Sequence, residues 1–277
     1  MISEVEAREE LLSLGPLNDG FLVHATAVHE MREAHFHTEL ELNLVTSGTA
    51  TLLLAGRRFE LKRGSMVWLA PRQGHILLNV SPSFGYWLGV FSPDLVESVV
   101  QVGGFPVLGN DEGTLCRRLS GTDFGRLSQT FESIGFFPSA PCSRLALPFS
   151  LAASWAAYES GHAGMGEQVL HPCVQAAIAL LTHTKIEWKL KRLAQEVGVS
   201  PSYLSALFRA QTGTTITDFR NLLRLDRYRN NMLRNPSTIS EAAIEAGFGS
   251  YAQFYRVHKE GLGRTPSLRT TKARVTD

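Results

Sequence analysis

Between Gly20 and about Phe91 the chain alternates between apolar and polar positions in short runs. Representative runs are LELNLVTSG, ATLLLAGRRFELKRG and SMVWLAP. Period-two alternation over roughly 4–8 residues, bounded by turn residues, is typical of half-buried strands. The AGR of Ala55–Arg57 and the KRGS of Lys62–Ser65 are predicted to be hairpin turns. This part of the sequence therefore predicts an all-β barrel or sandwich.

Beyond Pro93 the apolar positions follow a helical period. The segments DLVESVVQVG, FGRLSQTFESIGFF and SRLALPFSLAASWAAYESG are predicted helices, and Pro148 in the last of them predicts a kink or break. The Gly-rich GHAGMGE is the predicted linker, and everything after it has a helical pattern. We expect an α+β chain in four parts: a barrel over 1–92, a helical region over 93–160, a linker over 161–167 and an all-α domain over 168–277.

Composition places the chain among ordinary globular proteins. Its 277 residues suit two domains, and 44% of them are hydrophobic and 19% charged. No segment approaches the roughly 18 consecutive apolar residues of a membrane span, and the N-terminus lacks the pattern of a secretory signal. Three widely spaced cysteines, Cys116, Cys142 and Cys173, argue against a disulfide framework or a Cys-rich zinc module. We therefore expect a cytoplasmic protein without a membrane partner.

Charge is distributed unevenly along the chain, although the net charge is only +1. Residues 185–277 carry 16 Lys and Arg against 8 Asp and Glu, whereas residues 1–184 carry 11 against 18. A positive field over a small domain favours a polyanionic partner, nucleic acid first. A solvated basic face is the plainer alternative.

Two segments of the C-terminal part have the layout of a helix-turn-helix unit. Such a unit needs a small residue where its helices touch, a Gly with positive φ in the turn, and an apolar residue on the inner side of the second helix. The residues that meet these needs are Ala194, Gly198 and Leu204 in the first segment, and Ala243, Gly247 and Phe254 in the second. The arginine-rich TDFRNLLRLDRYRNNMLRN joins the two. Two such units favour a double helix-turn-helix, DNA-binding domain.

These segments resemble the AraC/XylS-type transcription regulators. The resemblance rests on LAQEVGVSPSYLSALFRAQTG, LLRLDRYRNNML and AIEAGFGSYAQFYRVHKEGLGRTP. It implies seven helices, two recognition helices in successive major grooves, a homodimer whose contacts lie in the helical region, and RNA polymerase as a partner. The DNA-binding residues it indicates are Ser202, Ser205, Arg209, Tyr251, Gln253, Tyr255, Arg256 and Lys259. Ala206 departs from the family, which commonly carries Arg at that position.

The stretch HFHTELELNLVTSG is a candidate for metal or ligand binding. Residues two apart on a strand share a face, so His35, His37, Glu39 and Glu41 are expected to point the same way. Imidazole and carboxylate are good ligands for divalent metals. The spacing of His35, His37, Glu41 and Gly48 resembles the first cupin motif, and the stretch from Gly64 through His75 to Asn79 resembles the second. Cupin barrels are a common N-terminal sensor of this regulator family.

Three interpretations of the barrel residues remain open. His35, His37, Glu41 and His75 could hold a divalent metal, contact a small-molecule effector without a metal, or be structural polar groups at the barrel mouth. We favour effector contact, with no cofactor required. We add Trp68 to the predicted contacts, because an aromatic face would suit a sugar, although core packing explains that ring equally well.

The function predicted is a sequence-specific transcription regulator that responds to a small molecule, and not an enzyme. The alternative is a cupin metalloenzyme with a helical assembly domain. An enzyme would need neither the basic C-terminal domain nor two DNA-reading helices.

We predict that DNA binding by the C-terminal domain weakens steeply as salt rises, because each neutralised phosphate releases counterions. Fluorescence anisotropy with labelled duplex DNA over a series of salt concentrations measures the slope. An affinity that does not change with salt would contradict an electrostatic contact with the backbone.

Overall fold

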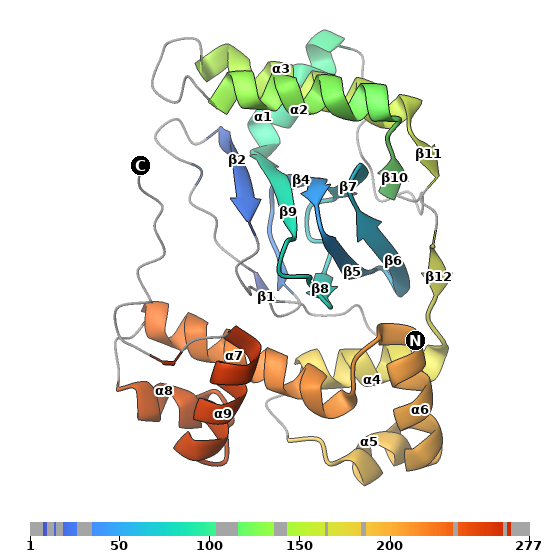
Figure 1. The fold of residues 1–277 in the computed structure, drawn as a ribbon, viewed down its shortest axis with the longest axis vertical. Coiled ribbons are helices and arrows are strands. Elements are labelled where there is room, and N and C mark those ends of the chain that lie inside the picture. Colours follow the sequence, from blue (N-terminus) through green and yellow to red (C-terminus); the bar gives the residue numbers. More distant parts are fainter. Residues whose placement is uncertain are drawn as a thin grey trace.

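The computed structural model describes residues 8–9, 14, 19–26, 35–103, 116–135, 143–163, 166–183, 187–234, 238–262 and 265–266. Two β-sheets lie between two sets of helices (Figure 1). The helices α1–α3 lie on one side of the sheets, and the C-terminal helices α4–α9 lie on the other. In the described part of the chain, no helix is long and apolar enough to cross a membrane.

The strands form two six-stranded sheets, which confirms the predicted β domain. The first, called sheet one, has the order β1 (Arg8–Glu9), β3 (His35–Phe36), β8 (His75–Leu78), β5 (Thr49–Leu54), β6 (Arg57–Lys62) and β12 (Gln168–Val169). Sheet two has the order β11 (His162–Ala163), β10 (Cys116–Arg118), β7 (Ser65–Leu69), β4 (Leu40–Ser47), β9 (Gly85–Phe91) and β2 (Gly20–Thr26).

The turn between β5 and β6 shows how local chemistry sets the register. Ala55 and Gly56 both have positive φ, 49° and 70°, which matches the twist of a two-residue hairpin. The register that follows pairs Leu54 with Arg57 and Leu52 with Phe59. The hairpin predicted at this point is confirmed.

The inner faces of the two sheets pack against each other in an apolar core. Leu52 and Leu54 of β5 lie in this core with Val67 and Leu69 of β7. Alternate residues point outward, because successive side chains of a strand leave opposite faces. The outer faces of both sheets are also buried in part.

Helices α1 (Pro93–Gly103), α2 (Gly121–Gly135) and α3 (Ser143–Ser160) cover the outer face of sheet two. Leu42, Met66 and Trp68 of that face pack with Phe131 and Trp155 of the helices. Helix α3 continues through Pro148, so the predicted break does not occur.

The segment predicted as a linker is attached to both sheets. Within it, β11 pairs with β10, and Glu167 forms an ion pair with Arg57. Directly after it, β12 pairs with β6. The barrel therefore draws on residues well beyond 92, because β10, β11 and β12 complete its edges.

The C-terminal domain is built from α4 (Pro172–His183), α5 (Leu190–Glu196), α6 (Pro201–Thr212), α7 (Ile216–Arg234), α8 (Ile239–Glu245) and α9 (Tyr251–Leu262). The described residues hold these six of the seven helices that the resemblance implies. The place of a seventh lies beyond residue 266, outside the described residues.

The outer face of sheet one is covered by the C-terminal domain. Leu53, Ile76 and Leu78 belong to one apolar cluster with Val174 of α4 and Phe208 of α6. Strand β8 and helix α4 face each other in Figure 1. The barrel and the first helix-turn-helix unit therefore share a hydrophobic core.

Candidate functional site

Two strands from different sheets bring the polar residues of the barrel together. On β4, Leu40, Leu42 and Leu44 point outward into the cluster beneath the helices, so Glu41 points inward. On β8, Ile76 and Leu78 point outward, so His75 points inward. His37 lies in the short segment between β3 and β4.

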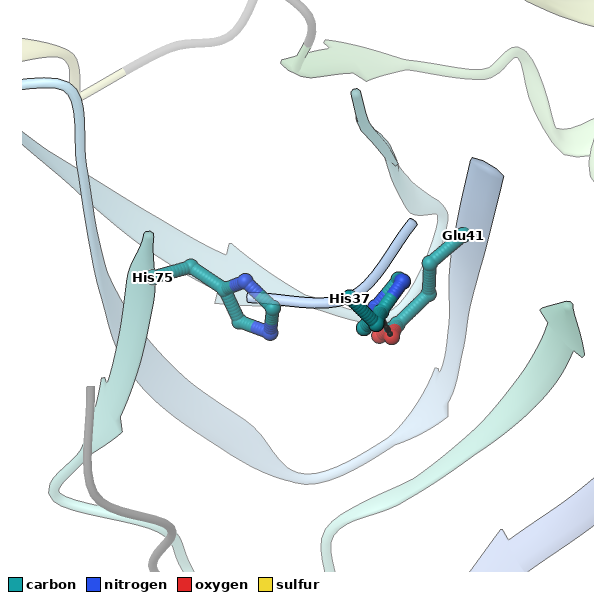
Figure 2. A group of neighbouring side chains, drawn as sticks. All are labelled: His37, Glu41 and His75. Atoms are coloured by element: carbon teal, nitrogen blue, oxygen red, sulfur yellow. Dashed lines mark hydrogen bonds and ion pairs between the residues drawn. The ribbon is translucent and has the colours of Figure 1, made fainter. Parts of the chain in front are cut away.

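The three side chains converge, as Figure 2 shows. The Nε2 atom of His37 lies 2.8 Å from Oε2 of Glu41. The rings of His37 and His75 have their centroids 6.1 Å apart at an interplanar angle of 78°. One ligand atom from each of the three residues lies within 4.8 Å of the others, and all three residues are buried.

Backbone carbonyls fix the orientation of both imidazoles. Nδ1 of His37 donates to the carbonyl of Glu39 at 2.9 Å, and Nδ1 of His75 donates to the carbonyl of Gln73 at 3.1 Å. A carbonyl can only accept, so Nδ1 carries the proton in each ring. Nε2 is therefore the nitrogen that each ring presents to a ligand.

The pKa values of His37 and Glu41 shift in opposite directions. Burial disfavours the imidazolium, but the hydrogen bond and the charge of Glu41 outweigh burial and raise the pKa of His37 above 6.5. Burial also disfavours the carboxylate, yet the hydrogen bond from His37 and the nearby charge of His75 lower the pKa of Glu41 to about 2. Both shifts favour a proton on Nε2 of His37, which then donates to Oε2 of Glu41.

This arrangement fits a divalent cation. Two imidazoles and one carboxylate are a recurrent ligand set, and histidines that bind metals usually donate the other ring nitrogen to an oxygen, as both do here. The second oxygen of Glu41 is held by Nδ2 of Asn43 at 2.6 Å. A metal would take the place of the proton on Nε2 of His37.

Of the other predicted barrel residues, Trp68 does not join this group. It is fully buried on the outer face of sheet two, with its ring centroid 6.3 Å from that of Trp155. The backbone of His35 pairs with that of His75, while the side chain of His35 lies outside the described part of the structure.

Two further residues border the group. Asn43 holds Glu41, and Glu39 is buried with its Oε2 making no hydrogen bond within the described residues. The every-second-residue pattern had placed Glu39 on this face, and it also extends to Asn43, for which it was the available signal.

The predicted helix-turn-helix geometry is confirmed. Gly198 and Gly247 have φ of 73° and 96°, in the left-handed region that favours glycine. The amide after each Gly closes the turn by donating to the carbonyl of the small residue, Val199 to Ala194 and Phe248 to Ala243. Both alanines are fully buried, as the close approach of two helices requires.

The predicted DNA-binding residues lie on two recognition helices. On α6, Ser202 and Arg209 are exposed and Ser205 is half-buried. On α9, Tyr251, Tyr255, Arg256 and Lys259 are exposed. Gln253 differs from these residues, because its Oε1 accepts from the backbone N–H of Gly249 at 3.0 Å and so stabilises the start of α9. A bidentate contact to adenine would need that oxygen.

A barrel with a buried polar group, joined to two helix-turn-helix units, defines a DNA-binding regulator with a ligand-binding domain. Comparison with known families agrees with this class. Residues 19–122 match the AraC-like ligand binding domain, and residues 193–269 match a helix-turn-helix domain. Together the matches cover well over half of the chain, which belongs to the AraC family of transcription regulators.

Curated relatives match in the C-terminal part. The HTH-type transcriptional regulator GlxA of Rhizobium meliloti is 37% identical over 102 residues, which is 36% of this chain and 31% of that protein. The bifunctional transcriptional activator/DNA repair enzyme Ada of Escherichia coli is 34% identical over 76 residues, 27% of this chain and 21% of Ada. The chain thus spans less than a third of the length of these relatives.

Among solved structures, ToxT from Vibrio cholerae aligns with 91% of this chain and 96% of its own, at 15% identity and a TM-score of 0.37. The AraC-like transcriptional activator CuxR aligns with 68% of this chain and 66% of its own, at 14% identity and a TM-score of 0.35.

The opposite pKa shifts of His37 and Glu41 predict that their contact stabilises the fold most at an intermediate pH. The contribution of Glu41 is present above about pH 4.5 and is lost as pH falls toward its folded pKa of about 2. The contribution of His37 is present below about pH 6.5 and is lost as pH rises through its raised folded pKa. Glu41→Gln removes both contributions.

We compare the free energy of unfolding of chelator-treated wild type with that of Glu41→Gln. The wild-type value should be the larger, and the difference should be greatest between about pH 4.5 and 6.5. Denaturant titrations across this range measure the difference. Glu132→Gln, an exposed change on α2, is the control and should show no such maximum. If the two free energies of unfolding differed by the same amount at every pH, the proposed pKa shifts would be contradicted.

Proposed function

We propose that the chain is a sequence-specific transcription regulator whose DNA binding responds to a small polar molecule bound at His37, Glu41 and His75. The observation that carries this proposal is the position of β8. This strand contributes His75 to the polar group on its inner face, and Ile76 and Leu78 to the core shared with the DNA-binding domain on its outer face. A ligand that moves β8 therefore acts on the polar group and on the core shared with the DNA-binding domain.

A hydrogen bond also links the end of β8 to the DNA-binding domain. Asn79 follows β8 directly and has φ of 50°, which places its side chain beside the end of α6. Its Nδ2 donates to the carbonyl of Thr212 at 2.8 Å, the last residue of that recognition helix. Gly213 caps the helix with φ of 73°, and a Cβ at that position would lie 2.6 Å from Nδ2 of Asn79. The fit leaves little room for β8 to shift without moving α6.

The effector is proposed as a small polar molecule that contacts the group directly or through a divalent metal. A sugar has less support than the sequence indicated, because Trp68 lies on the far side of sheet two. When bound, a metal would act as a Lewis acid that attracts oxygen atoms of the effector. His37, Glu41 and His75 would hold it, and Asn43 would orient Glu41.

We also propose double-stranded DNA, RNA polymerase and a second copy of the chain as partners, and the cytoplasm as its location. The barrel is proposed to regulate and not to catalyse. The support is the core that it shares with the DNA-binding helices.

We expect a screen of the full chain to find a ligand that raises its melting temperature, because a molecule that binds only the folded state stabilises it. The panel consists of sugars, organic acids, amino acids and the ions Zn²⁺, Fe²⁺, Ni²⁺ and Mn²⁺. The shift should be lost in His37→Ala and His75→Ala. His24→Ala, an exposed histidine on β2, should retain it.

Metal analysis of protein purified without an affinity-tag metal separates the two forms of the site. A near-stoichiometric divalent metal supports binding through a metal, and its absence supports direct contact. A ligand response that survives both His37→Ala and His75→Ala would place the effector elsewhere.

Coupling through Asn79 is expected to be separable from ligand binding. Asn79→Asp keeps the size and the tolerance of positive φ but removes the donor to the Thr212 carbonyl. The ligand should still raise the melting temperature, while its effect on DNA affinity should fall by about threefold or more, since one hydrogen bond contributes about 0.5–1.5 kcal/mol.

Fluorescence anisotropy with and without the ligand measures that effect. Gln101→Glu, an exposed amide on α1, is the matched control. An unchanged response in Asn79→Asp would exclude this contact from the coupling.

A further inference from the structure

The two recognition helices begin in the same way, which places their residues in correspondence. Ser200 caps α6 by accepting from the amide of Tyr203 at 3.2 Å, and Ser250 does the same for the amide of Gln253 at 3.2 Å. Four residues after each cap, a fully buried side chain packs inward, Leu204 in α6 and Phe254 in α9. Residues 50 apart in the sequence are therefore equivalent.

This correspondence shows that the two helices present different chemistry to DNA. Ala206 and Arg256 occupy the same position, two residues past the buried anchor, and both are exposed. Beside them, the half-buried Ser205 corresponds to the exposed Tyr255. One helix thus presents a methyl group where the other presents a guanidinium.

The remaining long side chain at the start of α6 is directed toward another helix. The ring of Tyr203 packs edge-on with that of His171, with centroids 6.4 Å apart, beside the beginning of α4. Ser202 and Ser205 are short. The side chains that precede Ala206 therefore allow this end of α6 to approach base edges closely.

The two side chains suit different base pairs. A guanidinium donates two hydrogen bonds to O6 and N7 of guanine, whereas a methyl group has no donor or acceptor. The only apolar group that a base pair offers in the major groove is the C5 methyl of thymine. An exposed Ala at a reading position is therefore complementary to thymine.

We propose that Ala206 selects thymine in one half-site at the position where Arg256 selects guanine in the other. The two half-sites would lie about one helical turn, roughly 10 base pairs, apart. This inference rests on the DNA-binding function proposed above and names the bases that each unit distinguishes. The operator would then be asymmetric within the site of one chain.

The test begins with selection of DNA sites by the full-length protein. Arg256→Ala identifies its guanine, because preference at that base pair should fall by about tenfold. Each thymine of the other half-site is then replaced in turn by deoxyuridine, which removes only the methyl group. We expect one replacement to weaken binding by roughly fourfold, the effect of one buried methyl group.

Ala206→Gly should remove the sensitivity to that replacement. Because the result is a double-mutant cycle, any general weakening of α6 by glycine cancels. The other thymines of the same half-site are internal controls. Ala206→Arg, in a second selection, should change the preferred base at this position from thymine to guanine.

Two results would overturn the inference: equal binding to every deoxyuridine site, or a second selection in which Ala206→Arg leaves the preference unchanged. If selection yields no preferred sequence at all, sequence-specific DNA binding itself is wrong. If base preference depends on Arg256 but not on Ala206, the protein is still a sequence-specific DNA-binding regulator, and the proposed role of Ala206 is wrong.

Discussion

The structure depends on the pleat of sheet one, because its strands β5 and β8 are covered on both faces. Leu52 and Leu54 of β5 fill the barrel, while Leu53 between them fills the core shared with the C-terminal domain. The alternation of side chains along one strand thus serves two hydrophobic cores. A shift of register by one residue would direct His75 into the interdomain core and Ile76 into the polar group.

Much of the fold follows from local patterns in the sequence. The alternating runs predicted the strands, and Ala55 with Gly56 predicted a hairpin that the positive φ values confirm. The helix-turn-helix units followed from Gly198 and Gly247, because the steric demands of a tight turn can be recognised without tertiary information. The His37–Glu41 contact was predictable for the same reason, since it is local in sequence.

The remaining features depend on contacts distant in sequence. Which face of sheet two Trp68 occupies depends on the helices that cover that sheet. The strands β10 to β12 are only two or three residues long, too short to show a period, and form by pairing with strands already in place. The contact of Gln253 with Gly249 depends on a side-chain rotamer. The apolar run Leu52–Leu54 did carry a signal for burial on both faces, since such runs are typical of doubly covered strands.

The shared core also determines where this chain can be divided. Leu53, Ile76 and Leu78 are covered by the first helix-turn-helix unit, whereas the second unit has its own apolar cluster around Phe254. A chimera that exchanges everything after the barrel would need a new partner for three buried side chains. An exchange within α7 would keep the interdomain core and transfer only α8 and α9. For the design of hybrid regulators, the portable part of this protein is half of its DNA-binding domain.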